Sequence, residues 1–284
     1  MKAIFLGGDI RQKYACEFLN KNNIFSECFM DFFLDNTIKR KIGNADILVL
    51  PIPLMKDSKN IYTSNDNSIN IYEIINLINS KSKIYGGNFT EELKEYFTAH
   101  KISYVDYFDM NYFQINNAFL SAEGAIYYAK ERLEKSLYGL DVAILGLGRI
   151  GKILAFLLHS HGAKITICTR KESDFVWSKL IGFNSFKINF GGNVSNLDLI
   201  NDKFDLIINT IPSWIMNENF IRKMDYDTVI IDVASYPYGI DESLAERYKL
   251  KYYRELKIPG RYAPKSAGEI IGQTIINTIN NAED

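Results

Sequence analysis

The chain has 284 residues, and its 33 Lys and Arg against 34 Asp and Glu give a formal net charge of −1 at pH 7. This length predicts two domains or one large one, and 47% hydrophobic with 24% charged residues is typical of globular proteins. The balanced charge argues against a protein held to nucleic acid by phosphate contacts, and no stretch approaches the ~18 apolar residues of a membrane span. Three scattered cysteines and no signal-peptide pattern predict a cytoplasmic protein without disulfides or a metal centre.

Apolar runs alternate with helical patterns along the first half of the chain. We expect strands over residues 2–6, 46–52, 83–85 and 102–105, and helices over residues 11–22 and 90–98. Thr90 followed by Glu91 and Glu92 is typical of a helix start, with an N-cap and an acidic first turn. The alternation predicts an N-terminal α/β domain of flavodoxin or Rossmann type over residues 1–120. We expect this domain to form the substrate side of the protein.

A helix over residues 121–138 is predicted between the two halves, because small and apolar residues recur there at helical spacing. Ser121 would cap this helix, and Glu123 would lie in its first turn. We therefore expect a linker helix over residues 121–139 that carries the chain into a second domain.

The second half repeats the alternation, with strands expected over residues 141–145, 164–168, 205–209, 228–232 and 251–253. Helices are expected over residues 150–159, 217–223, 241–248 and 266–279, and Gly268 and Gly272 in the last one suggest a close backbone approach. This pattern predicts a second α/β domain, of Rossmann type, over residues 140–260 and a C-terminal helix, residues 261–284, that returns to the N-terminal domain. The predicted fold class is α/β, with two doubly wound parallel-sheet domains.

The strongest motif is GxGxxG, which stands directly between an apolar strand and an apolar helix. The first glycine permits the tight bend, the second lets a pyrophosphate approach the backbone, and the third lets helix and strand pack closely. The helix N-terminus then offers N–H groups and a partial positive charge to the phosphates. We expect a dinucleotide-binding turn, the alternative being a tight structural turn, formed by Gly146, Leu147, Gly148, Arg149, Ile150 and Gly151.

The end of the next strand indicates which dinucleotide is bound. NAD-binding domains usually have an acidic residue there, whereas this strand ends in Thr169, Arg170 and Lys171. Arg170 could bind a 2′-phosphate while Thr169 donates a hydrogen bond, which favours NADP over NAD. We therefore expect residues 140–260 to form an NADP-binding Rossmann domain. The alternative is that Arg170 and Lys171 form a solvated helix start.

Two later strand ends carry residues suited to a nicotinamide pocket, because ligands of open α/β sheets bind beyond the carboxyl ends of the strands. Hydroxyl groups would come from Thr210, Ser213 and Ser235, and an apolar wall from Ile211, Pro212 and Val233. For each hydroxyl, the alternative is an ordinary structural cap.

Taken together, these motifs resemble the A-subunit family of dipicolinate synthase, the NADP-dependent dehydrogenase subunits of spore-forming bacteria. The resemblance spans almost the whole chain and rests on the GxGxxG turn together with Gly7-Gly8-Asp9-Ile10-Arg11, Ser121-Ala122-Glu123-Gly124, Asn209-Thr210-Ile211-Pro212-Ser213, Asp232-Val233-Ala234-Ser235 and Ala263-Pro264-Lys265-Ser266-Ala267-Gly268. One departure is that the family often reads Pro-Thr-x-Glu-Gly where this chain has Leu120-Ser121-Ala122-Glu123-Gly124.

The resemblance implies a function. Such a protein would oxidise a dihydrodipicolinate-type intermediate of the lysine pathway to dipicolinate, with NADP as hydride acceptor. It would act with the flavoprotein-like B subunit of dipicolinate synthase in the cytoplasm of the mother cell of a sporulating bacterium. A homo-oligomer is an open possibility.

The implied reaction needs cations for two substrate carboxylates and an acceptor for one proton. For the cations we favour Arg11 and Lys265 over Arg261, in a cleft expected between the domains. For the proton acceptor we favour Glu123, beside Ser121, over Asp9. Arg11 could instead be a surface charge or a partner of Asp9, and Glu123 could only complement a helix dipole.

Two other functions fit the same sequence. The first is another two-domain NAD(P)-dependent dehydrogenase, acting on a 2-hydroxy acid or an amino acid. The second is a non-catalytic NADP-binding subunit whose partner holds the catalytic groups.

Overall fold

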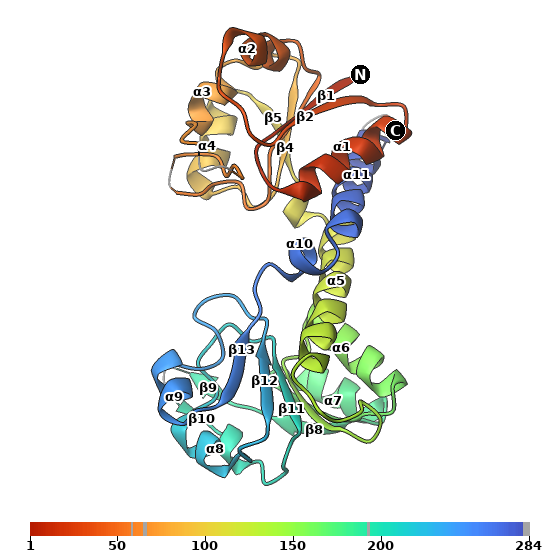
Figure 1. Ribbon diagram of the computed structural model, residues 1–284, viewed down its shortest axis with the longest axis vertical. Coiled ribbons are helices and arrows are strands. Elements are labelled where there is room, and N and C mark those ends of the chain that lie inside the picture. Colours follow the sequence, from red (N-terminus) through yellow and green to blue (C-terminus); the bar gives the residue numbers. More distant parts are fainter. Residues whose placement is uncertain (58, 65–66, 192–193, 281–284) are drawn as a thin grey trace. The chain divides into compact units, whose positions relative to one another are not determined.

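The computed structural model describes residues 1–57, 59–64, 67–191 and 194–280. The chain forms two compact units (Figure 1), one made of Met1–Asn117 with Gly260–Asp284 and the other of Ala118–Pro259. Each unit is an α/β structure built around a parallel sheet. The predicted fold class is therefore confirmed.

The sheet of the first unit has five parallel strands in the order β2-β1-β3-β4-β5. Their bounds are Lys2–Leu6 (β1), Phe25–Phe29 (β2), Ile47–Val49 (β3), Lys83–Gly86 (β4) and Ser103–Asp106 (β5). The central strands are continuously apolar because helices cover both of their faces, and Phe5 in β1 and Leu48 in β3 are fully buried. The strand order reverses between β1 and β3, which is where open α/β sheets bind ligands.

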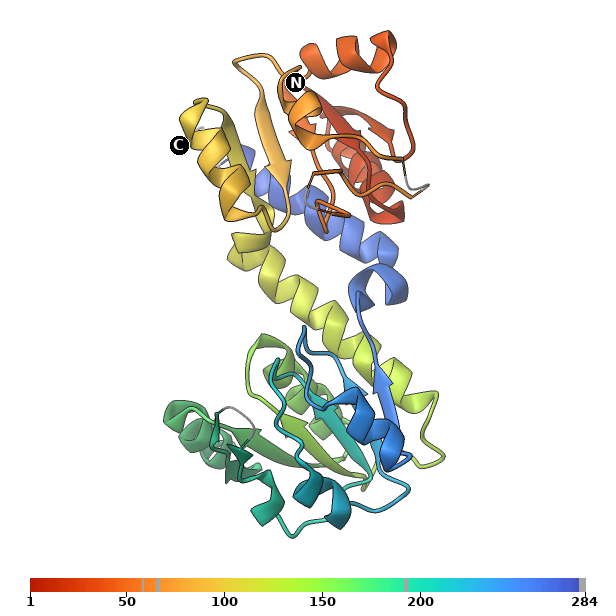
Figure 2. The ribbon, with the colours of Figure 1, turned by 90° about the vertical axis from the view of Figure 1, so that its left-hand side faces the viewer.

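Two helices far apart in the sequence, α1 (Ile10–Lys21) and α11 (Pro264–Asn280), lie side by side in this unit (Figures 1 and 2). A Cβ atom at Gly268 would lie 2.5 Å from the Arg11 carbonyl oxygen, and one at Gly272 would lie 2.7 Å from Cδ1 of Phe18. The close approach suggested by these two glycines is therefore confirmed. The helices of the unit are α1 (Ile10–Lys21), α2 (Asn36–Gly43), α3 (Ile71–Ile75), α4 (Glu91–Ala99), the 3₁₀ turn η1 (Tyr107–Asp109) and α11 (Pro264–Asn280).

The sheet of the second unit has six parallel strands in the order β13-β12-β11-β6-β7-β8. Their bounds are Asp141–Leu145 (β6), Lys164–Thr169 (β7), Asn184–Lys187 (β8), Leu206–Asn209 (β11), Val229–Asp232 (β12) and Lys251–Arg254 (β13). The strand order reverses between β6 and β11, so the turn after β6 lies at the position where ligands bind. A separate antiparallel pair joins β9 (Phe190–Gly191) to β10 (Val194–Ser195).

The helices of the second unit are short apart from α6. They are α6 (Arg149–Ser160), α7 (Glu172–Leu180), the 3₁₀ turn η2 (Leu197–Leu199), α8 (Glu218–Lys223) and α9 (Glu242–Arg247), and α10 (Ile258–Tyr262) follows β13. In the part of the chain that the structure describes, no helix combines the length and the apolar character of a membrane span.

The linker helix predicted over residues 121–139 is shifted in the structure: α5 extends over Asn111–Lys130, so it begins ten residues earlier than predicted and also ends earlier. The predicted start is wrong because Phe113 and Leu120 are buried and extend the apolar pattern upstream. Ser121 therefore lies in the interior of α5 and does not cap it, and Glu123 lies in its second half. A proline, which disrupts helix interiors, would be costly at Leu120.

Several elements of the structure were not predicted from the sequence. Strand β2 lies at an edge of its sheet, and its sequence FSECF has two polar residues in a row, so it contains no continuous apolar run. Helix α7 exposes Trp177 (63%) and Leu180 (72%) and buries few side chains, so its sequence lacks a clear apolar face. Helices α2 and α3 and strand β8 are also absent from the prediction.

Candidate functional site

The glycine turn after β6 has the geometry that the motif predicts. Gly146 has a φ of +98°, and a Cβ atom there would lie 2.5 Å from Oγ1 of Thr210. A Cβ atom at Gly151 would lie 2.1 Å from the Gly146 carbonyl oxygen, so only glycine lets the helix begin this close to the strand. Gly148 differs from both, because no atom lies within 4 Å of the place that its Cβ would take.

The open space at Gly148 faces the start of α6. Gly148 is the N-cap of this helix, and no side chain caps the helix there. The N–H groups of the first turn have no acceptor inside the helix and attract an anion. Arg149 is exposed, Ile150 is half-buried, and Leu147 is buried beneath the turn. These residues fit a pyrophosphate held on backbone N–H groups.

The end of β7 lies beside this turn, because the Gly146 N–H donates to the Cys168 carbonyl at 2.8 Å. Thr169 is buried, whereas Arg170 and Lys171 are exposed and Lys171 is the N-cap of α7. The position that usually carries an acid in NAD-binding domains thus carries exposed cations in this chain.

The loops after β11 and β12 contain the residues predicted for a nicotinamide pocket. The Thr210 hydroxyl donates to the Leu145 carbonyl at 2.9 Å, so it joins the loop to the glycine turn. Ile211 and Val233 are half-buried, and both Pro212 and Ser235 are exposed. Ser213 is half-buried, and its N–H donates to the Ile211 carbonyl at 2.9 Å.

A buried polar network that was not predicted lies beneath these loops. Asp232 ends β12 opposite Asn209, which ends β11, and both side chains are fully buried. Nδ2 of Asn209 donates to Oδ1 of Asp232 at 2.9 Å, and the Tyr252 hydroxyl donates to its Oδ2, also at 2.9 Å. The sequence signal for this network is that each of the two apolar strands ends in a polar residue.

In the first unit, the structure brings Asp9 and Arg11 together at the turn after β1. Asp9 is the N-cap of α1 and pairs with Arg11 through Nε at 2.8 Å and Nη2 at 2.7 Å. Burial opposes the charge of Arg11, but its hydrogen bond and charge contact with Asp9 keep the pKa of the guanidinium above its usual value. Nη2 also donates to the Ile52 carbonyl, whereas Nη1 has no hydrogen-bond partner among the described residues.

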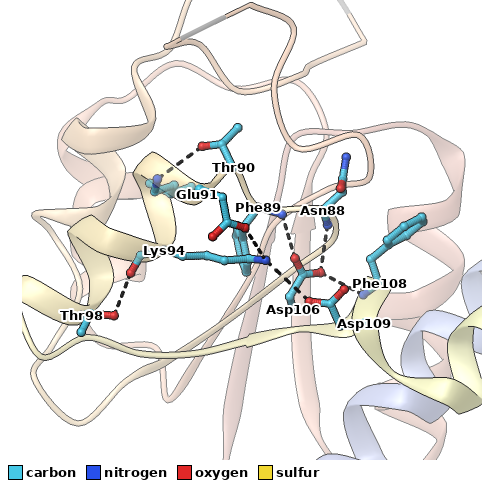
Figure 3. Close-up of polar contacts among 10 residues, drawn as sticks. Asn88, Phe89, Thr90, Glu91, Lys94, Thr98, Asp106, Phe108 and Asp109 are labelled. Carbon is cyan, nitrogen blue, oxygen red and sulfur yellow. Dashed lines mark hydrogen bonds and ion pairs between the residues drawn. The ribbon is translucent and has the colours of Figure 1, made fainter. Parts of the chain in front are cut away.

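A second buried carboxylate, Asp106, organises the loop after β4 (Figure 3). It accepts hydrogen bonds from the backbone N–H groups of Asn88 at 2.9 Å, Phe89 at 2.8 Å and Phe108 at 3.0 Å. Asn88 has a φ of +63°, in the left-handed region that asparagine tolerates better than most residues. No local pattern indicates this loop, because its partner Asp106 lies 18 residues further along the chain.

The other predicted catalytic residues are distributed over both units. Lys265 is the second residue of α11 and is exposed, as is Arg261 in α10. These two residues, like Asp9 and Arg11, belong to the first unit. Ser121 is buried and Glu123 half-buried on α5, in the part of that helix that belongs to the second unit.

Two α/β units with a glycine turn at the switch point of the second sheet define the fold class of the two-domain dehydrogenases. D-lactate dehydrogenase from Escherichia coli has this fold, with a TM-score of 0.64 at 12% identity over 100% of this chain and 97% of that one.

Within this class, residues 2–108 match the family described as the N-terminal domain of the A subunit of dipicolinate synthase. The A subunit of dipicolinate synthase from Bacillus subtilis (strain 168) is 26% identical over 97% of this chain and 94% of its own length. The crystal structure of the corresponding protein from Bacillus halodurans has a TM-score of 0.83 at 25% identity, covering 98% of this chain and 97% of that one. The predicted resemblance to the A subunit of dipicolinate synthase is therefore confirmed.

Proposed function

We propose that this chain is the NADP-dependent dehydrogenase subunit of a dipicolinate synthase. It would oxidise a dihydrodipicolinate-type intermediate of the lysine pathway to dipicolinate during sporulation. The observation that carries the proposal is the open glycine turn at Gly148, within a chain that resembles the A subunit of dipicolinate synthase along 97% of its length.

The cofactor would lie along the carboxyl edge of the second sheet. Its pyrophosphate would take the open space at Gly148, and the first turn of α6 would donate hydrogen bonds to it. Arg170 would bind the 2′-phosphate, assisted by Lys171 and Thr169. Ile211, Pro212 and Val233 would form the wall beside the nicotinamide, with hydroxyl groups from Thr210 and Ser235. When bound, NADP supplies the acceptor for the substrate hydride.

The substrate ring carries two carboxylates, for which this chain offers two cations in its first unit. Lys265 is exposed and can pair directly with a carboxylate. Arg11 is held in place by Asp9, and its Nη1 is still available for a substrate oxygen. A guanidinium fixed by a neighbouring carboxylate loses little entropy on binding, which suits it to orient a planar ligand.

Conversion of the dihydro ring to the aromatic ring releases one hydride and one proton. We assign the proton to Glu123, with Ser121 in support and Asp9 as the second choice. The assignment predicts that Glu123→Gln lowers turnover by about 100-fold or more while leaving NADPH binding and the melting temperature unchanged. Glu131→Gln, which changes an exposed glutamate just after the same helix, is the matched control and should keep full turnover. Near-normal turnover in Glu123→Gln would contradict the assignment.

The relatives are named as one subunit of dipicolinate synthase, which indicates a multi-subunit enzyme, so we propose a flavoprotein-like B subunit as the partner. The function is tested by following NADPH formation with a dihydrodipicolinate-type substrate and with simple 2-hydroxy acids, each with and without the partner. We expect turnover only with the ring dicarboxylate and a preference for NADP over NAD. Turnover of 2-hydroxy acids instead would indicate a different dehydrogenase, and NADPH binding without any turnover would indicate a non-catalytic subunit.

A further inference from the structure

We infer that Asp232 is a positioning residue, whose buried carboxylate fixes the two loops, residues 210–213 and 233–239, that flank the nicotinamide pocket. This inference rests on the proposed function, because the pocket is the one assigned there. Asp232 itself is fully buried, so it would act on the cofactor only through the loops that it holds.

Four hydrogen bonds converge on the Asp232 carboxylate. Oδ1 accepts from Nδ2 of Asn209 at 2.9 Å and from the Ala234 N–H at 3.0 Å. Oδ2 accepts from the Gly239 N–H at 2.7 Å and from the Tyr252 hydroxyl at 2.9 Å. The two backbone donors lie near the two ends of the loop 233–239, so one side chain closes that loop.

Asn209 extends the same restraint to the loop after β11. Its Nδ2 donates to the Ile211 carbonyl at 3.0 Å as well as to Asp232, and its Oδ1 accepts from the Ile211 N–H at 3.1 Å. A Cβ atom at Gly239 would lie 2.4 Å from Nδ2 of Asn209, so the two loops meet with no room for a side chain. The N–H groups of Ile215 and Met216 both donate to the Gly239 carbonyl at 3.0 Å and complete the link.

The loop 233–239 also carries backbone strain. Tyr238 has a φ of +69°, a conformation that is strained for an aromatic residue and persists only where the surroundings enforce it. The guanidinium of Arg254 lies 3.9 Å from the Tyr238 ring centroid and pairs with Glu242 at 3.1 Å. A loop that is strained and fastened from two sides is built to keep one shape, as a preorganised pocket requires.

A carboxylate is needed at this position for a geometric reason. Two oxygens must accept from four donors, two of which are fixed backbone N–H groups. In Asp232→Asn, the amide would set an NH₂ group against one pair of these donors, and the loops would lose their shared support. Burying a carboxylate costs desolvation free energy, so a residue at this position that served packing alone would be apolar.

The experiment compares Asp232→Asn with the unaltered protein in its affinity for NADPH, for NADH and for adenosine 2′,5′-bisphosphate, which represents the adenosine half of NADP. We expect the affinity for NADPH to fall by about tenfold or more, because the nicotinamide wall is displaced. The affinity for the bisphosphate should change by less than about twofold, because the glycine turn and Arg170 are untouched. Tyr252→Phe removes only one of the four donors, and it replaces Asp232→Asn in the experiment if that variant does not fold. It should lower the affinity for NADPH in the same way but by a smaller factor.

Asp205→Asn is the matched control. Asp205 is a partly buried carboxylate of the same unit, and it accepts from the Asp141 N–H at 3.0 Å and from Lys135 at 2.5 Å, at the amino end of β11. Its loss should lower the melting temperature without changing either affinity. Unchanged NADPH affinity in folded Asp232→Asn, or an equal loss for both ligands, would overturn the inference. If the unaltered protein bound neither dinucleotide, the proposed function would fail first, and with it the inference. Tighter binding of NADH than NADPH would remove only the preference for NADP and leave the comparison valid with NADH.

Discussion

The sharpest prediction concerns Gly148→Ala, because the three glycines of the turn are required for different reasons. The backbone of Gly148 has φ −73° and ψ −164°, which alanine adopts without strain, and its Cβ would enter open space. We therefore expect the free energy of unfolding to change by less than about 0.5 kcal/mol. The new methyl group would nevertheless occupy the space that a pyrophosphate needs, so NADPH affinity should fall about 100-fold, or about 2.8 kcal/mol.

Gly151→Ala, unlike Gly148→Ala, should lower the stability of the protein. Its Cβ would lie 2.1 Å from the Gly146 carbonyl oxygen, where ordinary contact is 3.4–4 Å. Strand and helix would have to separate, which costs about 1–3 kcal/mol of stability. At this chain length, such a loss lowers the melting temperature by roughly 2–4 °C per kcal/mol.

The assay combines thermal unfolding with a fluorescence titration of NADPH for both variants. The reasoning is refuted if Gly148→Ala binds NADPH as tightly as the unaltered protein, since the open space would then have no part in binding. It is also refuted if Gly148→Ala loses as much stability as Gly151→Ala, because the space would then not be open.

The geometry supports three more predictions. Arg170→Ala should weaken NADPH binding by about 10- to 100-fold and leave the affinity for NADH unchanged in parallel titrations. Lys203→Ala, which removes another exposed cation, is the control. Equal loss of affinity for both cofactors would contradict a role of Arg170 in binding the 2′-phosphate. Arg11→Ala leaves Asp9 and the Ile52 carbonyl without their partner, so chemical denaturation should show a loss of about 2–3 kcal/mol, whereas no loss would mean that the pair is solvated. Burial raises the pKa of all three thiols, so at pH 8 a thiol reagent should label the native protein slowly and the unfolded protein quickly; rapid native labelling would contradict this. The same shift makes stability decline as pH rises from about 9 towards the raised values, which are about 11 for Cys16 and about 12 for Cys28 and Cys168.

The parts of the fold that can be predicted best from the sequence are the buried ones. Strands β1 and β6 are predicted to the residue, because strands covered on both faces are continuous apolar runs. The start of α4 is also correct, since the Thr90 hydroxyl caps the helix by accepting from the Leu93 N–H at 3.3 Å. Local chemistry decides these elements, so a local pattern is sufficient to find them.

The elements that depend on distant partners could not be predicted. A serine before an apolar run is typical of a helix cap, so the sequence places the start of α5 at Ser121, whereas burial of Phe113 extends the helix upstream. The loop held by Asp106 depends on a hydrogen-bond partner 18 residues away, and the bond from Asn209 to Asp232 spans 23 residues, so local spacing gives neither contact. At Arg11, the sequence left a substrate contact and a partner of Asp9 as alternatives, and only the structure shows that the pair with Asp9 is made.

A crystal structure of the protein with NADP and dipicolinate bound would test the cofactor assignment, on which the proposed function depends. We expect the pyrophosphate to contact the backbone N–H groups at Gly148 and the start of α6, with the 2′-phosphate at Arg170. A dinucleotide bound away from the glycine turn, or a 2′-phosphate without a contact to Arg170, would show the assignment to be wrong.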